Sequence, residues 1–221
     1  MSNIAENIIR VRERMQKAAG RAGRELSSIK LVAVTKTAAV EQIEEAFRCG
    51  IEDFGENRLQ TAEPKILALS LQKSVSWHMI GHLQTNKVKK ALGLFCLIHG
   101  LDSLKLARKI DEEAGKKGLV FPVFMEVNIS EEATKFGMKP QDAKVFLVQC
   151  RALPNIKVQG LMVMAPYSPD PEAARPHFKK AALLKKELGL KYLSMGMSGD
   201  FETAIEEGSD MVRIGTAIFG T

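Results

Sequence analysis

The sequence predicts an α/β fold, a single (β/α)8 barrel of the TIM type with an extra helix at the N-terminus. Short apolar or β-branched runs alternate with helical patterns along the chain, which favours parallel strands because each crossover must return the chain to the same edge. Polar and glycine residues follow directly after many of these runs. No GxGxxG pattern follows the first run, as an open dinucleotide-binding sheet would require.

The chain opens with an amphipathic helix, roughly residues 4–19. Its apolar positions recur every three or four residues and form one stripe: Ile4, Ile8, Val11, Met15 and Ala18. Strands are then predicted at residues 29–37, 51–55, 76–81, 95–102, 120–130, 156–164, 191–196 and 210–215. The helical segments that follow them begin near residues 40, 58, 87, 103, 141, 172, 201 and 216. This regular alternation justifies eight strand–helix units.

The residues after the strands distinguish a closed barrel from an open doubly wound sheet, which is the competing architecture. In a barrel the carboxyl ends of the strands meet in one ring, whereas in an open sheet they spread along an edge. The polar residues at these ends are Lys36, Glu56, Asn57, His82, Asp102, Asn128, residues 194–198 and residues 213–216. So many polar groups at strand ends favour a barrel with its site at the C-terminal mouth.

The composition is typical of a globular chain that needs no covalent staple. With 221 residues the barrel accounts for the whole sequence, and we expect residues 1–221 to form one domain. Cys49, Cys96 and Cys150 are far apart and have no metal-ligand spacing, which predicts no disulfide framework, no metal site and a reducing cytoplasm. We see no signal-peptide pattern and no stretch near the roughly 20 apolar residues of a membrane span.

The net charge of +6 is compatible with a nucleic-acid partner, but its distribution is not. Most cations are scattered or interleaved with acids. The densest group, Lys87, Lys89 and Lys90, has no aromatic residues among it. Solvated helix faces account for the excess, so we predict no nucleic-acid and no membrane partner.

Lys36 is the first candidate functional residue, because it ends the apolar run VAVTK and so lies on the inner rim of the barrel. Apolar surroundings disfavour an ammonium group, and a nearby cation such as Arg213 would disfavour it further. A free amine can condense with an aldehyde to form a Schiff base. The alternative for this segment alone is a lysine whose amine reaches solvent at a strand end.

Two loops rich in glycine and hydroxyl residues form the second candidate feature. SMGMSGD, residues 194–200, and RIGTAIFG, residues 213–220, follow the seventh and eighth strands, and each opens onto a helix. Backbone N–H groups of such turns, with a helix N-terminus behind them, bind anions, and the hydroxyls of Ser198 and Thr216 add donors. The loops after strands 7 and 8 are the frequent phosphate site of barrels, and closure brings strand 8 beside Lys36.

A phosphate site beside an amine suits an aldehyde that carries a phosphate. Pyridoxal 5′-phosphate (PLP) is such a ligand. A sugar phosphate bound by a Schiff-base aldolase would need the same pair of features. These residues by themselves leave both ligands open.

Seven segments make the sequence similar to the pyridoxal phosphate homeostasis protein family. They are LVAVTKT, FGENRLQ, WHMIGHLQTNK, MEVNISEEATKFGM, GLMVMAP, LSMGMSGD and VRIGTAIFG, and they run from residue 31 to residue 220. The resemblance implies a barrel like the N-terminal domain of alanine racemase, with PLP held as a Schiff base on Lys36. It also implies a role in intracellular vitamin B6 and PLP homeostasis, with PLP-dependent apo-enzymes as recipients of the cofactor.

The same resemblance assigns cofactor-binding residues. The strand-8 arginine of the racemase-like pattern, which faces the pyridine nitrogen, matches Arg213. The GEN segment supplies Asn57, near the ring or its phenolic oxygen. His82 and Lys87 lie in a matching segment but receive no role. The phosphate donors match four residues of the two loops: Ser198, Gly199, Gly215 and Thr216.

The resemblance also bears on catalysis. An arginine at the ring nitrogen does not stabilise a protonated pyridinium, so the ring is a poorer electron sink. Racemisation needs a second acid or base, which alanine racemase takes from a tyrosine in an additional C-terminal domain of a partner subunit. The sequence ends at Thr221, and its tyrosines are Tyr167, in a loop, and Tyr192, at the entry of a strand. We therefore expect a monomeric PLP carrier with no catalytic residues; the alternative is a PLP-dependent amino-acid racemase-like enzyme.

Overall fold

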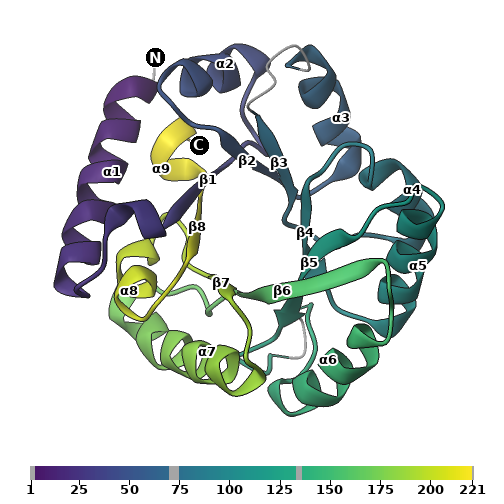
Figure 1. The fold of residues 1–221 in the computed structure, drawn as a ribbon. Helices are drawn as coiled ribbons and strands as arrows, with labels where there is room; N and C mark the ends of the chain where they lie inside the picture. Colours follow the sequence, from purple (N-terminus) through teal and green to yellow (C-terminus); the bar gives the residue numbers. More distant parts are fainter. Residues whose placement is uncertain (1–2, 70–74, 133–135, 221) are drawn as a thin grey trace.

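The computed structural model describes residues 3–69, 75–132 and 136–220, which form a closed barrel of eight parallel strands surrounded by helices (Figure 1). The strands follow one another around the barrel in sequence order, and β8 closes it by pairing with β1. The strands are β1 (Lys30–Val34), β2 (Asp53–Glu56), β3 (Ser76–Met79), β4 (Leu97–Leu101), β5 (Phe121–Val127), β6 (Ile156–Val163), β7 (Tyr192–Ser194) and β8 (Met211–Ile214). The predicted fold class is confirmed.

One helix precedes the barrel and the others follow the strands. They are α1 (Ile4–Arg21), α2 (Val40–Arg48), α3 (Leu59–Ala68), α4 (Val88–Ala91), α5 (Leu104–Gly115), α6 (Ala143–Arg151), α7 (Arg175–Leu188), α8 (Phe201–Glu206) and α9 (Thr216–Phe219). Short 3-10 turns lie at η1 (Leu26–Ser28), η2 (Thr85–Lys87), η3 (Pro140–Asp142) and η4 (Pro171–Ala174). In the described part of the chain, no helix has the length and apolar character needed to cross a membrane.

The predicted elements are all present, and their ends differ in one systematic way. Every strand except β2 ends one to three residues before its predicted end. The reason is that polar and glycine residues at these positions leave the sheet and form the mouth loops. The predicted strand at residues 29–37, for example, ends at Val34, and Lys36 lies in a turn.

Strand side chains alternate between the barrel interior and the layer under the helices, because the side-chain period of a strand is two. Trp77 belongs to the core under the helices and packs against Phe54, with ring centroids 5.4 Å apart. His78, the next residue, is buried on the opposite face. A separate apolar cluster fills the barrel itself: Leu97, Phe124, Met162 and Met211, with Met164 and Tyr192 packed against it.

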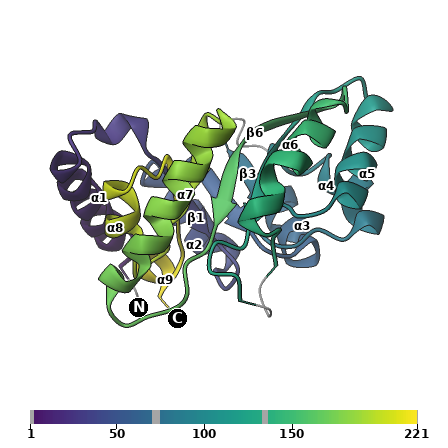
Figure 2. The same ribbon diagram turned by 90° about the horizontal axis from the view of Figure 1, so that it is seen from below.

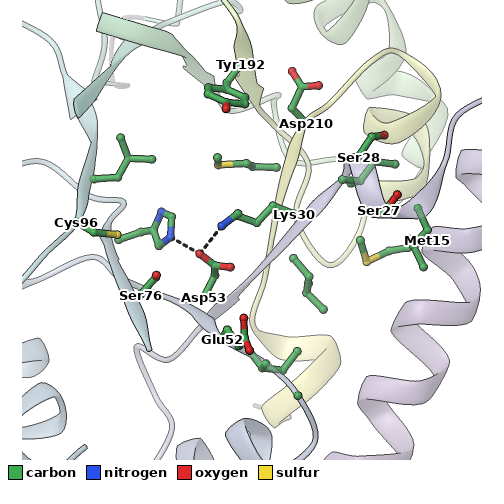
Figure 3. Close-up of a pocket in the computed structure, with 18 of the residues that line it drawn as sticks. Met15, Ser27, Ser28, Lys30, Glu52, Asp53, Ser76, Cys96, Tyr192 and Asp210 are labelled. Carbon is green, nitrogen blue, oxygen red and sulfur yellow. Dashed lines mark hydrogen bonds and ion pairs between the residues drawn. The ribbon is translucent and has the colours of Figure 1, made fainter. Parts of the chain in front are cut away.

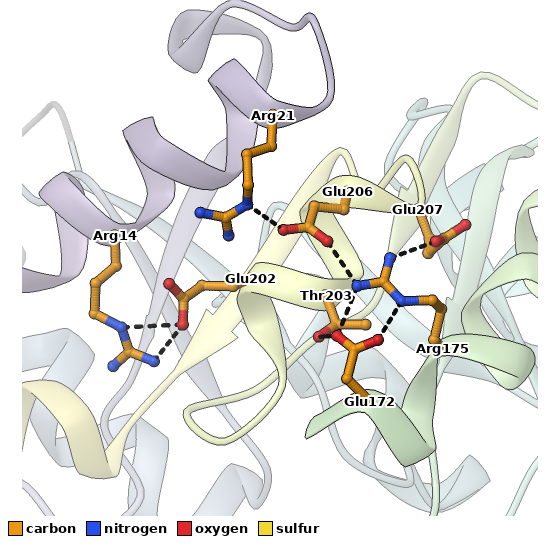
Figure 4. Close-up of polar contacts among 8 residues, drawn as sticks. All are labelled: Arg14, Arg21, Glu172, Arg175, Glu202, Thr203, Glu206 and Glu207. Atoms are coloured by element: carbon orange, nitrogen blue, oxygen red, sulfur yellow. Dashed lines mark hydrogen bonds and ion pairs between the residues drawn. The ribbon is translucent and has the colours of Figure 1, made fainter. Parts of the chain in front are cut away.

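Helices α1, α8 and α7 pack side by side and hold the last two strand–helix units (Figure 2). Arg175, the first residue of α7, forms ion pairs with three carboxylates, those of Glu172, Glu206 and Glu207 (Figure 4). Glu206 also pairs with Arg21 of α1 at 2.6 Å. This network holds α8 against both neighbouring helices. The position of α8 in turn fixes the end of the loop that leads into it from β7.

Candidate functional site

Lys36 lies at the C-terminal mouth of the barrel, in the turn that follows β1. Val34 pairs with Gly55 of β2. Lys36 and Asn57 each follow this pair by two residues, so they lie on the same part of the rim. On the other side, a Cβ atom on Gly215 would lie 3.2 Å from the carbonyl oxygen of Val34, which places the loop after β8 against the end of β1. Lys36 is thus flanked by the loops that carry Asn57 and Gly215.

The side chain of Lys36 is exposed. The expectation that apolar surroundings would enclose this amine is therefore wrong for the protein alone, because β1 ends two residues earlier and Lys36 lies in the turn that follows it. An exposed primary amine remains accessible to an aldehyde and to other amines.

Two hydrogen bonds between Met197 and Asp200 close the loop after β7 into a turn. The Asp200 carboxylate accepts from the Met197 N–H at 2.6 Å, and the Asp200 N–H donates to the Met197 carbonyl at 3.1 Å. Among the described residues, these bonds leave the N–H groups of Ser198 and Gly199 without an acceptor. The Ser198 hydroxyl accepts from the Ala217 N–H at 3.2 Å, which joins this loop to the loop after β8.

The loop after β8 adds donors at the same place. Thr216 is the first residue of α9, so its N–H has no partner within the helix, and its side chain is exposed. Because the Ser198 bond to Ala217 holds the two loops together, N–H and O–H donors from both loops lie close to one another. Such a concentration of donors suits a phosphate group.

Arg213 is buried inside the barrel below the mouth. Its Nη1 donates to the Ser194 hydroxyl at 2.6 Å, and its Nη2 donates to the Val163 carbonyl at 3.0 Å. Burial lowers the pKa of Arg213 to about 10, while the charges of Glu126 and Asp200 act against that shift. The guanidinium therefore stays cationic at neutral pH, and among the described residues these two bonds use two of its five N–H donors.

Similar proteins identify the family. A family model described as alanine racemase, N-terminal domain, matches residues 2–221. A pyridoxal phosphate homeostasis protein of Aquifex aeolicus (strain VF5) is 46% identical over 224 residues, which cover 99% of this chain and 98% of that protein. The chain belongs to the pyridoxal phosphate homeostasis protein family.

Other members of the family are similar to this chain over its whole length. The pyridoxal phosphate homeostasis protein of Escherichia coli (strain K12) is 35% identical over 229 residues, covering 100% of this chain and 97% of that protein. The structure of PipY of Synechococcus elongatus PCC7942 with PLP bound has a TM-score of 0.85 and 33% identity, covering 99% of this chain and 100% of that chain. An alanine racemase of Clostridium difficile 630 shares the fold, with a TM-score of 0.74 and 17% identity over 57% of its length.

In this member of the pyridoxal phosphate homeostasis protein family, the residues predicted from the sequence come together at one mouth: Lys36, Asn57, Ser198, Gly199, Arg213, Gly215 and Thr216. A cavity of about 430 Å³ opens beside Asn57, and His82 and Lys87 lie on its wall. His82 bonds to the Asp102 carboxylate at 2.8 Å and stacks on the Phe136 ring at 4.6 Å. Residues 133–135, part of the segment MEVNISEEATKFGM, lie outside the described residues.

A second cavity, of about 630 Å³, lies at the opposite end of the barrel, where the strands begin (Figure 3). Lys30, Asp53, Ser76 and Tyr192 line it, and none of the predicted site residues does. Tyr192 is therefore at the entry of its strand, as predicted. The other tyrosine, Tyr167, is 96% exposed.

Two features of the mouth were not predicted from the sequence. The first is a buried cluster beside Lys36, in which Glu56 accepts from the Thr35 hydroxyl at 2.7 Å and pairs with Lys65 at 2.7 Å. The Lys65 amine also donates to the Thr35 carbonyl, so it is held by two acceptors next to Lys36. Glu56 was visible as part of the GEN segment, but its partner comes from α3 and has no sequence signal.

The second feature is Glu126, near the end of β5. Its side chain is buried, and its Oε2 has no hydrogen-bond partner among the described residues. Burial raises the pKa of Glu126 to about 7, and the Asp102 charge adds to this, while the charges of Arg213 and His82 act against it. An acidic residue inside the apolar run VFMEV was a signal that could have found it. The mouth thus contains a carboxyl group that gains and loses its proton near neutral pH.

The Glu126→Gln variant is expected to gain stability relative to the parent as pH rises from 4.5 to 8. Near pH 4.5 the side chain is neutral in both proteins, so any difference in unfolding free energy that remains there is present at every pH. The folded-state pKa lies above the ordinary 4.5, so the unfolding free energy of the parent falls as pH rises from about 4.5 to about 7. The full difference is about 3 kcal/mol. Urea unfolding of both proteins between these pH values measures it.

A control with the opposite sign is Glu113→Gln. Ion pairing with Lys109 and Lys116 lowers the pKa of Glu113 to about 2, so this variant should lose stability at neutral pH rather than gain it. A difference between the Glu126→Gln protein and its parent that does not change with pH would contradict the assigned titration.

Proposed function

We propose that this chain binds PLP as a Schiff base on Lys36 and takes part in vitamin B6 and PLP homeostasis. The observation that carries the proposal is that three kinds of group lie at the C-terminal mouth of the barrel. They are an accessible amine, hydrogen-bond donors from two loops that could hold a phosphate, and a buried guanidinium. The names of the relatives and the PLP in PipY support it. Residues 1–221 would act as one PLP-binding unit.

Each group would have a distinct task. The Lys36 amine attacks the aldehyde carbon, and a water molecule leaves as the C=N bond forms. Ser198, Gly199, Gly215 and Thr216 would hold the phosphate. Arg213, still cationic at neutral pH, would disfavour a proton on the ring nitrogen, so the bound ring is a weak electron sink.

The exposure of Lys36 supports a role in cofactor supply, which would take place in the cytoplasm. An amine from another protein can reach the C=N carbon from solvent, bind there and release the Lys36 amine. The acceptors would be PLP-dependent apo-enzymes, and the carrier would act as a monomer without catalysis of its own. The large exposed fraction of Tyr167 and the position of Tyr192 at the far end of the barrel agree with this, because neither supplies an ordered acid at the mouth.

The test is an absorption spectrum of the purified protein with added PLP, before and after borohydride, followed by peptide mass analysis. We expect a visible band that disappears on reduction and a phosphopyridoxyl group on the peptide that contains Lys36. A protein that stays colourless and takes up no PLP would overturn the proposal. Reductive trapping of a sugar-phosphate aldehyde on Lys36, without PLP uptake, would instead establish the Schiff-base aldolase.

A racemase-like enzyme is the second candidate, and Glu126 is the observation that favours it. A buried carboxyl group with a pKa of about 7 on the interior side of the mouth is a plausible acid–base group. Such an enzyme would exchange the Cα hydrogen of an amino acid with D₂O in a reaction that needs both Lys36 and Glu126. We expect no exchange above the rate with free PLP.

Gly199→Ala should weaken PLP binding without unfolding the protein. A Cβ atom at Gly199 meets nothing within 4 Å, and its φ angle is not positive, so stability should stay within about 0.5 kcal/mol of the parent. The added methyl group would occupy space through which a phosphate approaches the backbone. Gly20→Ala is the matched control, because its Cβ is equally unobstructed and lies on α1, away from the mouth. Equal PLP affinities in both variants would remove Gly199 from the phosphate site.

A further inference from the structure

A continuous chain of hydrogen bonds crosses the interior of the barrel from β2 to β8. Its links are Asp53 Oδ1 to His78 Nε2 at 2.8 Å, His78 Nδ1 to His99 Nε2 at 3.0 Å, His99 Nδ1 to Ser194 Oγ at 3.1 Å and Ser194 Oγ to Arg213 Nη1 at 2.6 Å. His99 and Ser194 are fully buried, and His78 and Arg213 are 3% and 4% exposed. The five residues come from β2, β3, β4, β7 and β8.

The two ends of the chain lie in different surroundings. Asp53 lines the cavity at the start of the strands and also pairs with Lys30 at 2.8 Å (Figure 3). Arg213 belongs to the mouth that carries Lys36. Val32 pairs with both Asp53 and Arg213, so the two ends of the hydrogen-bond chain lie at the same level along the strands, while Lys36, four residues after Val32, lies about 13 Å further along. The Asp53 carboxylate is therefore too far from Lys36 to contact a ligand bound there directly.

The donors and acceptors of the chain form one consistent set when both histidines are neutral. Ser194 Oγ accepts from Arg213, so its own O–H donates to His99 Nδ1. The proton of neutral His99 then lies on Nε2 and is donated to His78 Nδ1. His78 carries its proton on Nε2 and donates it to the Asp53 carboxylate.

Adding one proton to His78 reverses two of these bonds. Protonated His78 carries hydrogen on both nitrogens, so its Nδ1 now donates to His99 Nε2. His99 must move its own proton to Nδ1 and donate it to Ser194. The Ser194 hydroxyl then accepts from both His99 and Arg213, and its O–H no longer points at His99.

We propose that Asp53, His78, His99 and Ser194 form a proton-responsive positioning relay for Arg213, in which proton uptake at His78 reverses the chain and changes how Ser194 holds the guanidinium. The relay connects the protonation state beside the cavity at the start of the strands to the hydrogen bonding of Arg213 on the other side of the barrel interior. The four residues are positioning residues, because only Arg213 faces the mouth. The consequence for bound PLP rests on the proposed function; the reversal itself does not.

The charges around the two histidines place the extra proton on His78. Burial acts to lower the pKa of His78, but bonds to Asp53 and Cys96 outweigh it, and the pKa is raised. Burial and the positive charges of His78 and Arg213 hold the pKa of His99 well below its usual range. His99 therefore passes the change on through its tautomer and does not itself become charged.

The reversal can be measured in the full-length protein without cofactor. The protein has four histidines, so long-range ¹H–¹⁵N NMR spectra can assign the tautomer of each ring between pH 5 and 9. We expect the proton of neutral His99 to move from Nε2 to Nδ1 as pH falls, with the same midpoint as the protonation of His78. A single His99 tautomer across this range would overturn the relay.

Two variants move that midpoint in opposite directions. Asp53→Asn keeps a hydrogen-bond acceptor but removes the charge, and should lower the midpoint by about one to two pH units. Lys30→Met removes the cation that competes for Asp53 Oδ1, and should raise the midpoint. General damage to the barrel would shift both variants the same way, so a shift of equal sign would count against the relay.

The link to the mouth is tested with PLP bound. The absorption of the cofactor should change with pH at the same midpoint as His99, follow the Asp53→Asn shift, and lose this dependence in Ser194→Ala. The coupling to Arg213 would be overturned if Asp53→Asn shifts the NMR midpoint of His99 but leaves the pH midpoint of the cofactor absorption unchanged. A protein that binds no PLP but shows the tautomer change would refute the proposed function and leave the relay intact.

Discussion

Replacing Lys36 by alanine is expected to abolish the visible band of bound PLP and all borohydride trapping. The amine is the nucleophile, and Lys65, whose amine bonds to the carbonyl of the adjacent Thr35, is held by that carbonyl and by Glu56. Phosphate and ring contacts would remain, so the variant should still bind PLP, more weakly and without a covalent bond. Absorption spectra and mass analysis after reduction measure the two effects separately.

Two further variants separate the covalent role of Lys36 from its charge. Lys36→Arg keeps the cation but forms no Schiff base, so it should also be colourless. Lys89→Ala removes an exposed lysine of α4 and should leave the band unchanged. Retention of the full band in Lys36→Ala would show that another amine holds the cofactor.

Gly196→Ala is expected to destabilise the protein by about 2–5 kcal/mol and to weaken PLP binding in the variant that remains folded. Gly196 has φ +92, and its Cβ would lie 2.5 Å from the Ala204 Cβ and 3.0 Å from the Phe201 Cα. Because α8 is tied to α1 and α7, it cannot move away, so the loop after β7 must shift. Urea unfolding measures the stability, and titration with PLP measures the binding.

Gly208 provides the control for backbone strain. It has φ +94, nearly the same as Gly196, but nothing lies within 4 Å of its added Cβ. Gly208→Ala should therefore cost only the about 1–2 kcal/mol of an alanine in a left-handed conformation. Equal losses in both variants would show that the contact with α8 is unimportant and that φ alone makes Gly196 necessary.

The order of the elements and the location of the site could be predicted from the sequence because they depend on local patterns. A strand followed by a helix can be recognised from apolar periodicity, and parallel strands bring their carboxyl ends together. Lys36, Ser198 and Arg213 could therefore be placed at one mouth before any coordinates. The family segments then narrowed the ligand from a phosphorylated aldehyde to PLP.

The surroundings of these residues could not be predicted in the same way. The exposure of Lys36 depends on where β1 ends, and the engagement of Lys65 depends on how α3 packs against the barrel. Glu126 is charged or neutral according to its burial and to the charges of Asp102 and Arg213, which approach from other strands. Each of these properties depends on distances between segments far apart in the chain.

The sequence by itself determined the barrel, the strand-end ring of polar residues and the family, because short-range periodicity and motif spacing carry that information. Only the tertiary structure decided that His78, His99 and Ser194 are linked inside the barrel and that the link ends on Arg213. In the sequence these residues are single polar positions in separate strands. Hydrogen bonds of about 3 Å between them exist only after the barrel closes, since closure sets the register and the inward direction of every strand.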